Sequence, residues 1–224
     1  MSPSADSRIP SLDGPRLAPA SGGPPRQLVI LLHGYGSNGA DMIQLAPIWQ
    51  AVLPDALFLA PNAPERCPMG GFQWWALTDF SRLGLAAGVR RAAPALDAYV
   101  DSQLAAHGIG EADLMLVGFS QGTMVALQIG PCRKNRLAGI VGYSGMIADP
   151  SGLARHVRSK PPILLVHGSS DGVVPVAAIH EAEAELHRLG FQVTKHVSRG
   201  LGHGVDPVGL DLGRGFARKV LLGA

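Results

Sequence analysis

Residues 113–130, with the sequence DLMLVGFSQGTMVALQIG, decide the fold of this chain. The apolar residues before Gly118 predict a buried strand, and those after Gly122 predict a helix. Ser120 falls at the sharp turn between them, where the backbone is strained and the residues two positions away must be small. Its hydroxyl is therefore expected at the C-terminal edge of a sheet, beside the positive end of a helix that favours a developing oxyanion.

The rest of the chain continues this alternation of short apolar runs and longer helical segments, which is typical of a mostly parallel sheet covered by helices on both faces. We therefore predict a single α/β domain over residues 27–224, preceded by an arm over residues 1–26 with an edge strand near 16–18. Pro94 should kink or split its helix. The predicted strands are 27–32, 56–60, 113–119, 137–143, 162–167 and 192–197, and the predicted helices are 40–53, 84–106, 121–129, 176–189 and 208–222.

Composition excludes several classes of protein. Of the 224 residues 46% are hydrophobic and 16% charged, which excludes a disordered chain. The net charge of +2, without a cluster of Lys and Arg, gives no indication of a nucleic-acid partner or an anionic membrane surface. No apolar run approaches the length of a signal peptide or a membrane span, and two cysteines do not suggest a disulfide scaffold. We therefore expect a cytoplasmic protein.

A serine hydroxyl is a poor nucleophile at neutral pH, so Ser120 would need a histidine base and a carboxylate that orients it. In this type of fold both follow the serine, on loops after later strands. His203 lies in the flexible turn 200–204, GLGHG, after the last predicted strand, and we predict that it is the base. The other histidines fit less well: His33 and His167 come too early, His196 lies within a strand, and His107, His156, His180 and His187 fall on helices or polar stretches.

Asp171 is the predicted acid, because it follows a strand and lies between Ser120 and His203 in the sequence. It also belongs to an Asp-Gly pair, which is common in plain turns. Asp149 and Asp206 are the alternatives.

The loop 32–39, LHGYGSNG, closes the first strong strand. Its glycines allow a tight turn that presents N–H groups, so we predict an oxyanion hole formed by the backbone amides of Tyr35 and Gln121. The loop does not match a phosphate-binding or dinucleotide-binding pattern, and the chain lacks the His and Cys spacings of common metal sites.

Together, the loop 33–39, the elbow 118–122, the stretch 167–175 and Gly202-His203-Gly204 resemble the carboxylesterase/phospholipase and acyl-protein thioesterase family of α/β-hydrolases. The resemblance spans residues 27–222. It implies a compact hydrolase without a cap domain, often a homodimer, in which Ser120, Asp171 and His203 form the triad. One departure is Thr123, where many thioesterase relatives carry a further glycine.

The expected function is hydrolysis of carboxylic esters through an acyl-enzyme, with no cofactor. Trp74 and Trp75 lie in a loop segment, where they either pack in the core or form a wall of the acyl pocket, and Met146, Val173 and Val174 are further candidates for its lining. Such walls favour an uncharged, small-molecule or lipid-like acyl ester. The alternatives are an acyl thioesterase with the same triad, an enzyme like dienelactone hydrolase, which would need a Cys at the elbow, and a non-catalytic binding module.

Overall fold

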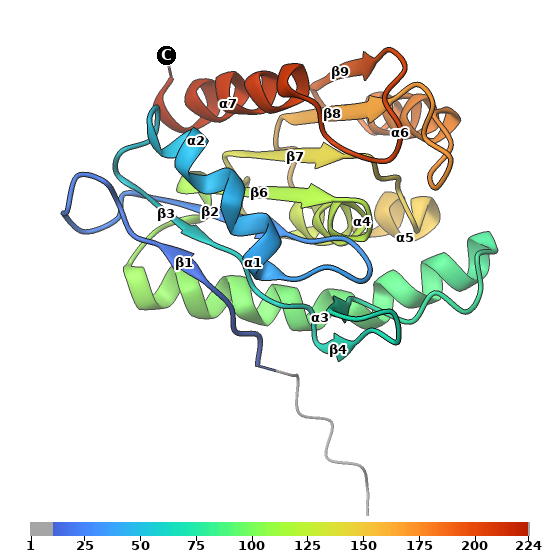
Figure 1. Cartoon of the computed structure of the whole chain (residues 1–224), viewed down its shortest axis with the longest axis horizontal. Coiled ribbons are helices and arrows are strands. Elements are labelled where there is room, and N and C mark those ends of the chain that lie inside the picture. The colour runs from blue at the N-terminus through green and yellow to red at the C-terminus, as the bar shows by residue number, and fades with distance from the viewer. Residues whose placement is uncertain (1–10, 224) are drawn as a thin grey trace, which may run out of the picture.

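The computed structural model describes residues 11–223, and these form a seven-stranded sheet with helices on both faces (Figure 1). The strand order is β1-β3-β2-β6-β7-β8-β9, and every pair is parallel except the edge pair of β1 and β3. The strands are β1 (Arg16–Leu17), β2 (Gln27–Leu32), β3 (Ala56–Leu59), β6 (Leu114–Phe119), β7 (Gly139–Tyr143), β8 (Ile163–Gly168) and β9 (Val193–Ser198). A separate two-stranded ribbon joins β4 (Glu65–Arg66) and β5 (Phe72–Gln73).

Two hydrophobic cores lie on opposite faces of the sheet. Side chains alternate along a strand, so that Ile30 of β2 enters one core while Leu31 enters the other. The first core is covered by α3 (Arg82–His107), α4 (Gln121–Ile129), α5 (Pro150–His156) and α6 (Ala177–Arg188), and the second by α1 (Gly39–Met42), α2 (Ala46–Gln50) and α7 (Pro207–Leu222). Burial on both faces explains why the central strands are continuously apolar in sequence.

The observed elements match the predicted α/β pattern, apart from their exact bounds and the ribbon of β4 and β5, which was not predicted. Three further differences concern the helices. The helix predicted over 40–53 is broken into α1, a 3₁₀ turn and α2. Pro94 lies inside a continuous α3, so the alternative of a split helix was wrong. Helix α5 was not predicted, because it is too short to show a helical pattern of apolar residues. Its sequence signal is at its N-terminus, where Asp149 caps the helix and Pro150 occupies the first turn.

The segment before β2 packs along the edge of the sheet. Strand β1 pairs antiparallel with β3, and the Ala60 N–H donates to the Pro15 carbonyl at 3.0 Å. Residues 1–10 of the predicted arm lie outside the described part of the chain. Among the helices of residues 11–223, none has the length and apolar character that crossing a membrane requires.

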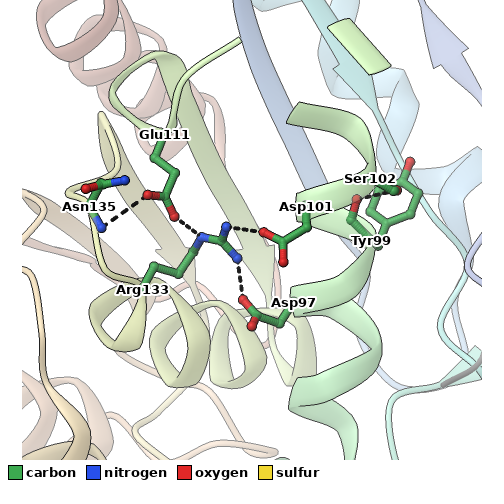
Figure 2. Close-up of polar contacts among 7 residues, drawn as sticks. All are labelled: Asp97, Tyr99, Asp101, Ser102, Glu111, Arg133 and Asn135. Carbon is green, nitrogen blue, oxygen red and sulfur yellow. Dashed lines mark hydrogen bonds and ion pairs between the residues drawn. The ribbon is translucent and has the colours of Figure 1, made fainter. Parts of the chain in front are cut away.

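Arg133 is the buried centre of an ionic cluster beside α3 (Figure 2). Its side chain is only 8% exposed and pairs with Asp97 and Asp101 of α3 and with Glu111 of the 3₁₀ turn before β6. Glu111 also accepts a hydrogen bond from the Asn135 N–H at 3.1 Å. A guanidinium withdrawn from water needs such partners, so the cluster fastens α3 to the start of the strand that leads to Ser120.

Candidate active site

Ser120 stands at the turn from β6 into α4 with a φ of 53°, a left-handed conformation that is strained for a residue with a side chain. The two flanking glycines make this turn possible. A Cβ atom on Gly118 would lie 2.3 Å from the Thr123 nitrogen, and one on Gly122 would lie 2.1 Å from the Leu32 carbonyl oxygen. Both contacts are with backbone that cannot move aside, so the sequence Gly-x-Ser-x-Gly is a steric requirement of the elbow.

Asp171 and His203 meet beside this elbow. Asp171 follows β8, and its Oδ2 atom accepts a hydrogen bond from His203 Nδ1 at 2.8 Å. Its other oxygen, Oδ1, accepts from the backbone N–H groups of Val173 and Val174, each at 2.8 Å. Burial by itself raises the pKa of the Asp171 carboxyl, but the hydrogen bonds from His203, Val174 and Val173 outweigh it and hold that pKa below its usual value. The carboxylate is therefore ionised and fixed in orientation.

His203 lies on the loop between β9 and α7, and its ring packs against the Phe119 ring with 5.0 Å between centroids. In a neutral imidazole whose Nδ1 donates to Asp171, the lone pair is on Nε2, where it can accept a proton. Phe119 directly precedes Ser120, so this contact brings the imidazole to the elbow. Within residues 11–223 the Ser120 hydroxyl makes no hydrogen bond, and such bonds commonly tighten only when substrate binds.

The loop after β2 approaches the same point. A Cβ atom on Gly34 would lie 3.2 Å from Ser120 Cβ, so glycine permits the close approach. The next residue, Tyr35, and the first residue of α4, Gln121, have backbone N–H groups that donate to no group in the described chain. Two unused donors that flank the serine are the arrangement an oxyanion hole requires.

An apolar cavity of about 270 Å³ opens beside Ser120. Of the five residues predicted as possible pocket walls, Met146, Val173 and Val174 line it, whereas the Trp74 and Trp75 side chains are buried in the core and do not. Ser120 and Gln121 of the elbow also line the cavity. The remaining lining residues were not predicted, and they are Leu77, Phe80, Leu85, Met124 and Pro175. These residues come from α3, α4 and separate loops, and no local sequence signal groups them.

The Gln121 side chain explains how the two tryptophans are held behind the site. Its Oε1 atom accepts a hydrogen bond from the backbone N–H of Trp74, and its Nε2 donates to the backbone carbonyl of Trp75, both at 2.8 Å. The Trp74 indole N–H donates to the His33 carbonyl at 2.9 Å. These hydrogen bonds thus fasten the two tryptophans, which directly follow β5, to the elbow and to the loop after β2.

The other candidate residues have structural roles. His33 is buried, and its Nε2 accepts from the Ala63 N–H at 2.9 Å; burial lowers its pKa and keeps it neutral. His167 was not predicted to take part, yet its Nε2 lies 3.3 Å from Asp171 Oδ2. The alternative acids, Asp149 and Asp206, cap the N-termini of α5 and α7.

Two further observations bear on other types of site. A larger cavity of about 600 Å³ lies between α3 and α5 and is lined by none of the three residues Ser120, Asp171 and His203. In the described chain, no group of three or more His, Cys, Asp or Glu side chains is placed to hold a metal ion.

Comparison with known proteins agrees with this geometry. The sequence profile of the phospholipase/carboxylesterase family matches residues 18–221. Acyl-protein thioesterase 1 of Schizosaccharomyces pombe is 35% identical over 66% of this chain and 69% of its own length, and esterase YpfH of Escherichia coli is 27% identical over 82% and 78%. The crystal structure of esterase PE8 superimposes with a TM-score of 0.90 at 42% identity, covering 94% of this chain and all of that one.

Proposed function

Because the chain belongs to the phospholipase/carboxylesterase family of α/β-hydrolases, we propose that it hydrolyses carboxylic esters with an apolar acyl group at Ser120, His203 and Asp171. The observation that carries this assignment is the pair of His203 and Asp171, joined at 2.8 Å beside the strained serine. A neutral imidazole held by an ionised carboxylate is the base that a serine nucleophile needs.

In the first half of the reaction, Ser120 Oγ attacks the ester carbonyl carbon while His203 Nε2 takes the hydroxyl proton. The negative charge that develops on the carbonyl oxygen is met by the N–H groups of Tyr35 and Gln121 and by the positive end of α4. The bond from carbon to the alkoxy oxygen then breaks, and the departing oxygen receives the proton from His203. An alcohol leaves, and the acyl group stays on Ser120.

In the second half, a water molecule attacks the acyl-enzyme and gives a proton to His203. The same two N–H groups stabilise the second oxyanion. When the bond to Ser120 Oγ breaks, the proton returns to the serine, and the carboxylic acid leaves. Asp171 stays ionised throughout and stabilises the imidazolium that forms in each half.

The cavity beside Ser120 supports an uncharged acyl group. Its walls are mostly aliphatic and aromatic, and Leu85 and Met124 come from helices that are fixed in the core. Its lining contains no charged side chain that would pair with a charged acyl group. A volume of about 270 Å³ accommodates a chain of several carbons.

Thioesters are the second candidate substrate class, because the relative in Schizosaccharomyces pombe is an acyl-protein thioesterase. A thioester forms the same oxyanion and acyl-enzyme, and only the leaving group differs.

Replacement of Ser120 by Ala tests the proposal, with p-nitrophenyl esters and the matching acyl thioesters from acetyl to palmitoyl as substrates. We expect turnover and labelling by a fluorophosphonate to be lost in Ser120→Ala while the thermal unfolding midpoint is retained. Ser102→Ala, on the exposed face of α3, is the matched control and should keep full activity. Burst kinetics that persisted in Ser120→Ala, or ligand binding without turnover in the unmodified protein, would contradict the assignment.

Location and assembly are further proposals. Cys67 and Cys132 are both free thiols, which fits the reducing cytoplasm. We also propose a homodimer, which sedimentation velocity at several protein concentrations would test.

A further inference from the structure

The end of strand β7 carries none of the three proposed catalytic residues, yet it lies between the strands that carry two of them. Phe119 at the end of β6 pairs with Tyr143, and Tyr143 pairs in turn with Val166 of β8. The next residue, Ser144, has a φ of 47° and is completely buried. It is the second non-glycine residue with positive φ in the described chain, besides Ser120 itself.

Three hydrogen bonds join this junction to all three catalytic segments. The Tyr143 carbonyl accepts from the Ser120 N–H at 2.8 Å, and the Ser144 N–H donates to the Val166 carbonyl of β8 at 2.9 Å. The Ser144 hydroxyl donates to the carbonyl of Gly204 at 3.0 Å, and Gly204 directly follows His203. The junction thus contacts the elbow, the strand before Asp171 and the loop of the base.

The loop of His203 needs such an anchor, because it contains glycines at positions 200, 202 and 204 and has little stiffness of its own. On one side of the histidine, the Leu201 carbonyl accepts from the Ser170 N–H at 2.9 Å. On the other side, the bond from Ser144 holds Gly204. The two bonds bracket His203 and fix its backbone relative to β8 and β7.

The strained backbone of Ser144 indicates that its hydroxyl has a role in holding the His203 loop. Glycine would adopt a φ of 47° without steric strain, whereas serine is strained there. The serine nevertheless occupies this position, and its hydroxyl reaches the His203 loop. Thr123 packs against the same junction, with its hydroxyl 2.9 Å from the Tyr143 carbonyl.

We propose that Ser144 is a positioning residue, which sets the place of the His203 imidazole over Ser120 through its hydrogen bond to Gly204. The inference rests on the proposed triad but adds a residue from outside it. Ser144 touches neither substrate nor reacting atoms. Its effect should therefore appear in kcat, because a base displaced by a fraction of an ångström weakens proton transfer without altering the acyl pocket.

The test compares Ser144→Ala with Ser144→Gly. Both variants remove the hydroxyl, but only the glycine also relieves the backbone strain. We expect kcat for a p-nitrophenyl ester to fall about tenfold to a hundredfold in both, with KM within about twofold of the unmodified enzyme. Ser198→Ala is the control: Ser198 is buried on β9, and its hydroxyl has no hydrogen-bond partner among residues 11–223, so kcat should stay unchanged.

A spectroscopic readout separates positioning from a general loss of structure. The proton that His203 Nδ1 shares with Asp171 should give a downfield NMR signal, which we expect to broaden in both Ser144 variants and to stay sharp in Ser198→Ala. Ser144→Cys keeps the size of the side chain with a weaker donor and should show an intermediate kcat; it also serves if the alanine variant does not fold.

Several outcomes would overturn the inference. A wild-type kcat in both Ser144 variants would show that Ser144 does not position His203. A wild-type kcat in Ser144→Gly alone would assign the loss in Ser144→Ala to backbone strain. A rise in KM at constant kcat would place Ser144 in the pocket. Ser120→Ala, measured in parallel, distinguishes these failures from failure of the proposed function, because full turnover in that variant would refute the triad itself.

Discussion

His203 donates from Nδ1 to Oδ2 of Asp171 at 2.8 Å, while Oδ1 of the same carboxylate accepts hydrogen bonds from the backbone N–H groups of Val173 and Val174. This division leaves Asp171 no freedom to turn, and it fixes the tautomer of the imidazole that faces Ser120. The chemistry proposed here depends on that fixed orientation.

Replacing Asp171 by Asn tests the orientation directly. The amide NH₂ would face a histidine that must then donate from Nε2, the wrong tautomer for accepting the serine proton, so kcat should fall by about 10⁴. Ester hydrolysis and circular dichroism together would check this result. Asp206→Asn is the matched control, because asparagine also caps a helix and should leave kcat unchanged. Comparable activity in both variants would remove Asp171 from the mechanism.

Hydrolysis should decline on acidification, because a protonated imidazole cannot accept the serine proton. Asp171 cannot account for that decline. Its folded-state pKa lies below the usual value, so the stability it contributes is present above about pH 4 and is lost only as the pH falls through the lowered pKa. The measurement is kcat/KM between pH 8 and 5 with unfolding followed in parallel. A rate that stays flat down to about pH 5 would contradict the role of His203.

The apolar cavity should set the limit on acyl length. Met124→Trp would fill part of it, so we expect octanoyl and longer p-nitrophenyl esters to lose about tenfold or more in kcat/KM, while acetyl ester hydrolysis stays within about twofold. Met69→Trp provides the control, since Met69 is 82% exposed and lies outside the lining. Equal losses for short and long esters would show that the acyl group binds elsewhere.

The Arg133 cluster should contribute to stability and not to catalysis. Arg133→Met leaves Glu111, which is 10% exposed, without its cation, and we expect the free energy of unfolding to drop by about 3 kcal/mol. Arg188→Met removes an exposed pair with Glu185 and should cost less than about 1 kcal/mol. Urea titrations of both variants give the comparison. Identical midpoints would mean that the cluster stabilises nothing.

Much of the architecture could be predicted from the sequence, because strands that are buried on both faces of the sheet have continuous apolar sequences, such as 28–32 and 114–117. The elbow was equally predictable, since Gly118 and Gly122 are imposed by backbone contacts within a few residues of Ser120. The contact between His203 and Asp171 followed from their order after later strands, and the structure contains it.

The remaining features depend on contacts between distant segments. Nothing local marks Phe80 and Met124 as neighbours in one cavity, or Trp75 as a core residue that packs against Gly88 of α3. The link from Ser144 to Gly204 is likewise invisible in sequence, because a serine after a strand normally indicates only a turn. These relationships exist only once the sheet has been assembled.

The strand order also governs how the chain acquires its structure. Leu28 pairs with Leu114, and the base and acid arrive on the last strands of the sheet, so nearly every contact at the site closes a long loop. Long-range parallel pairing is slow. After dilution from denaturant, we therefore expect helical circular dichroism to return first and hydrolysis last, so that enzyme activity reports completion of the native topology.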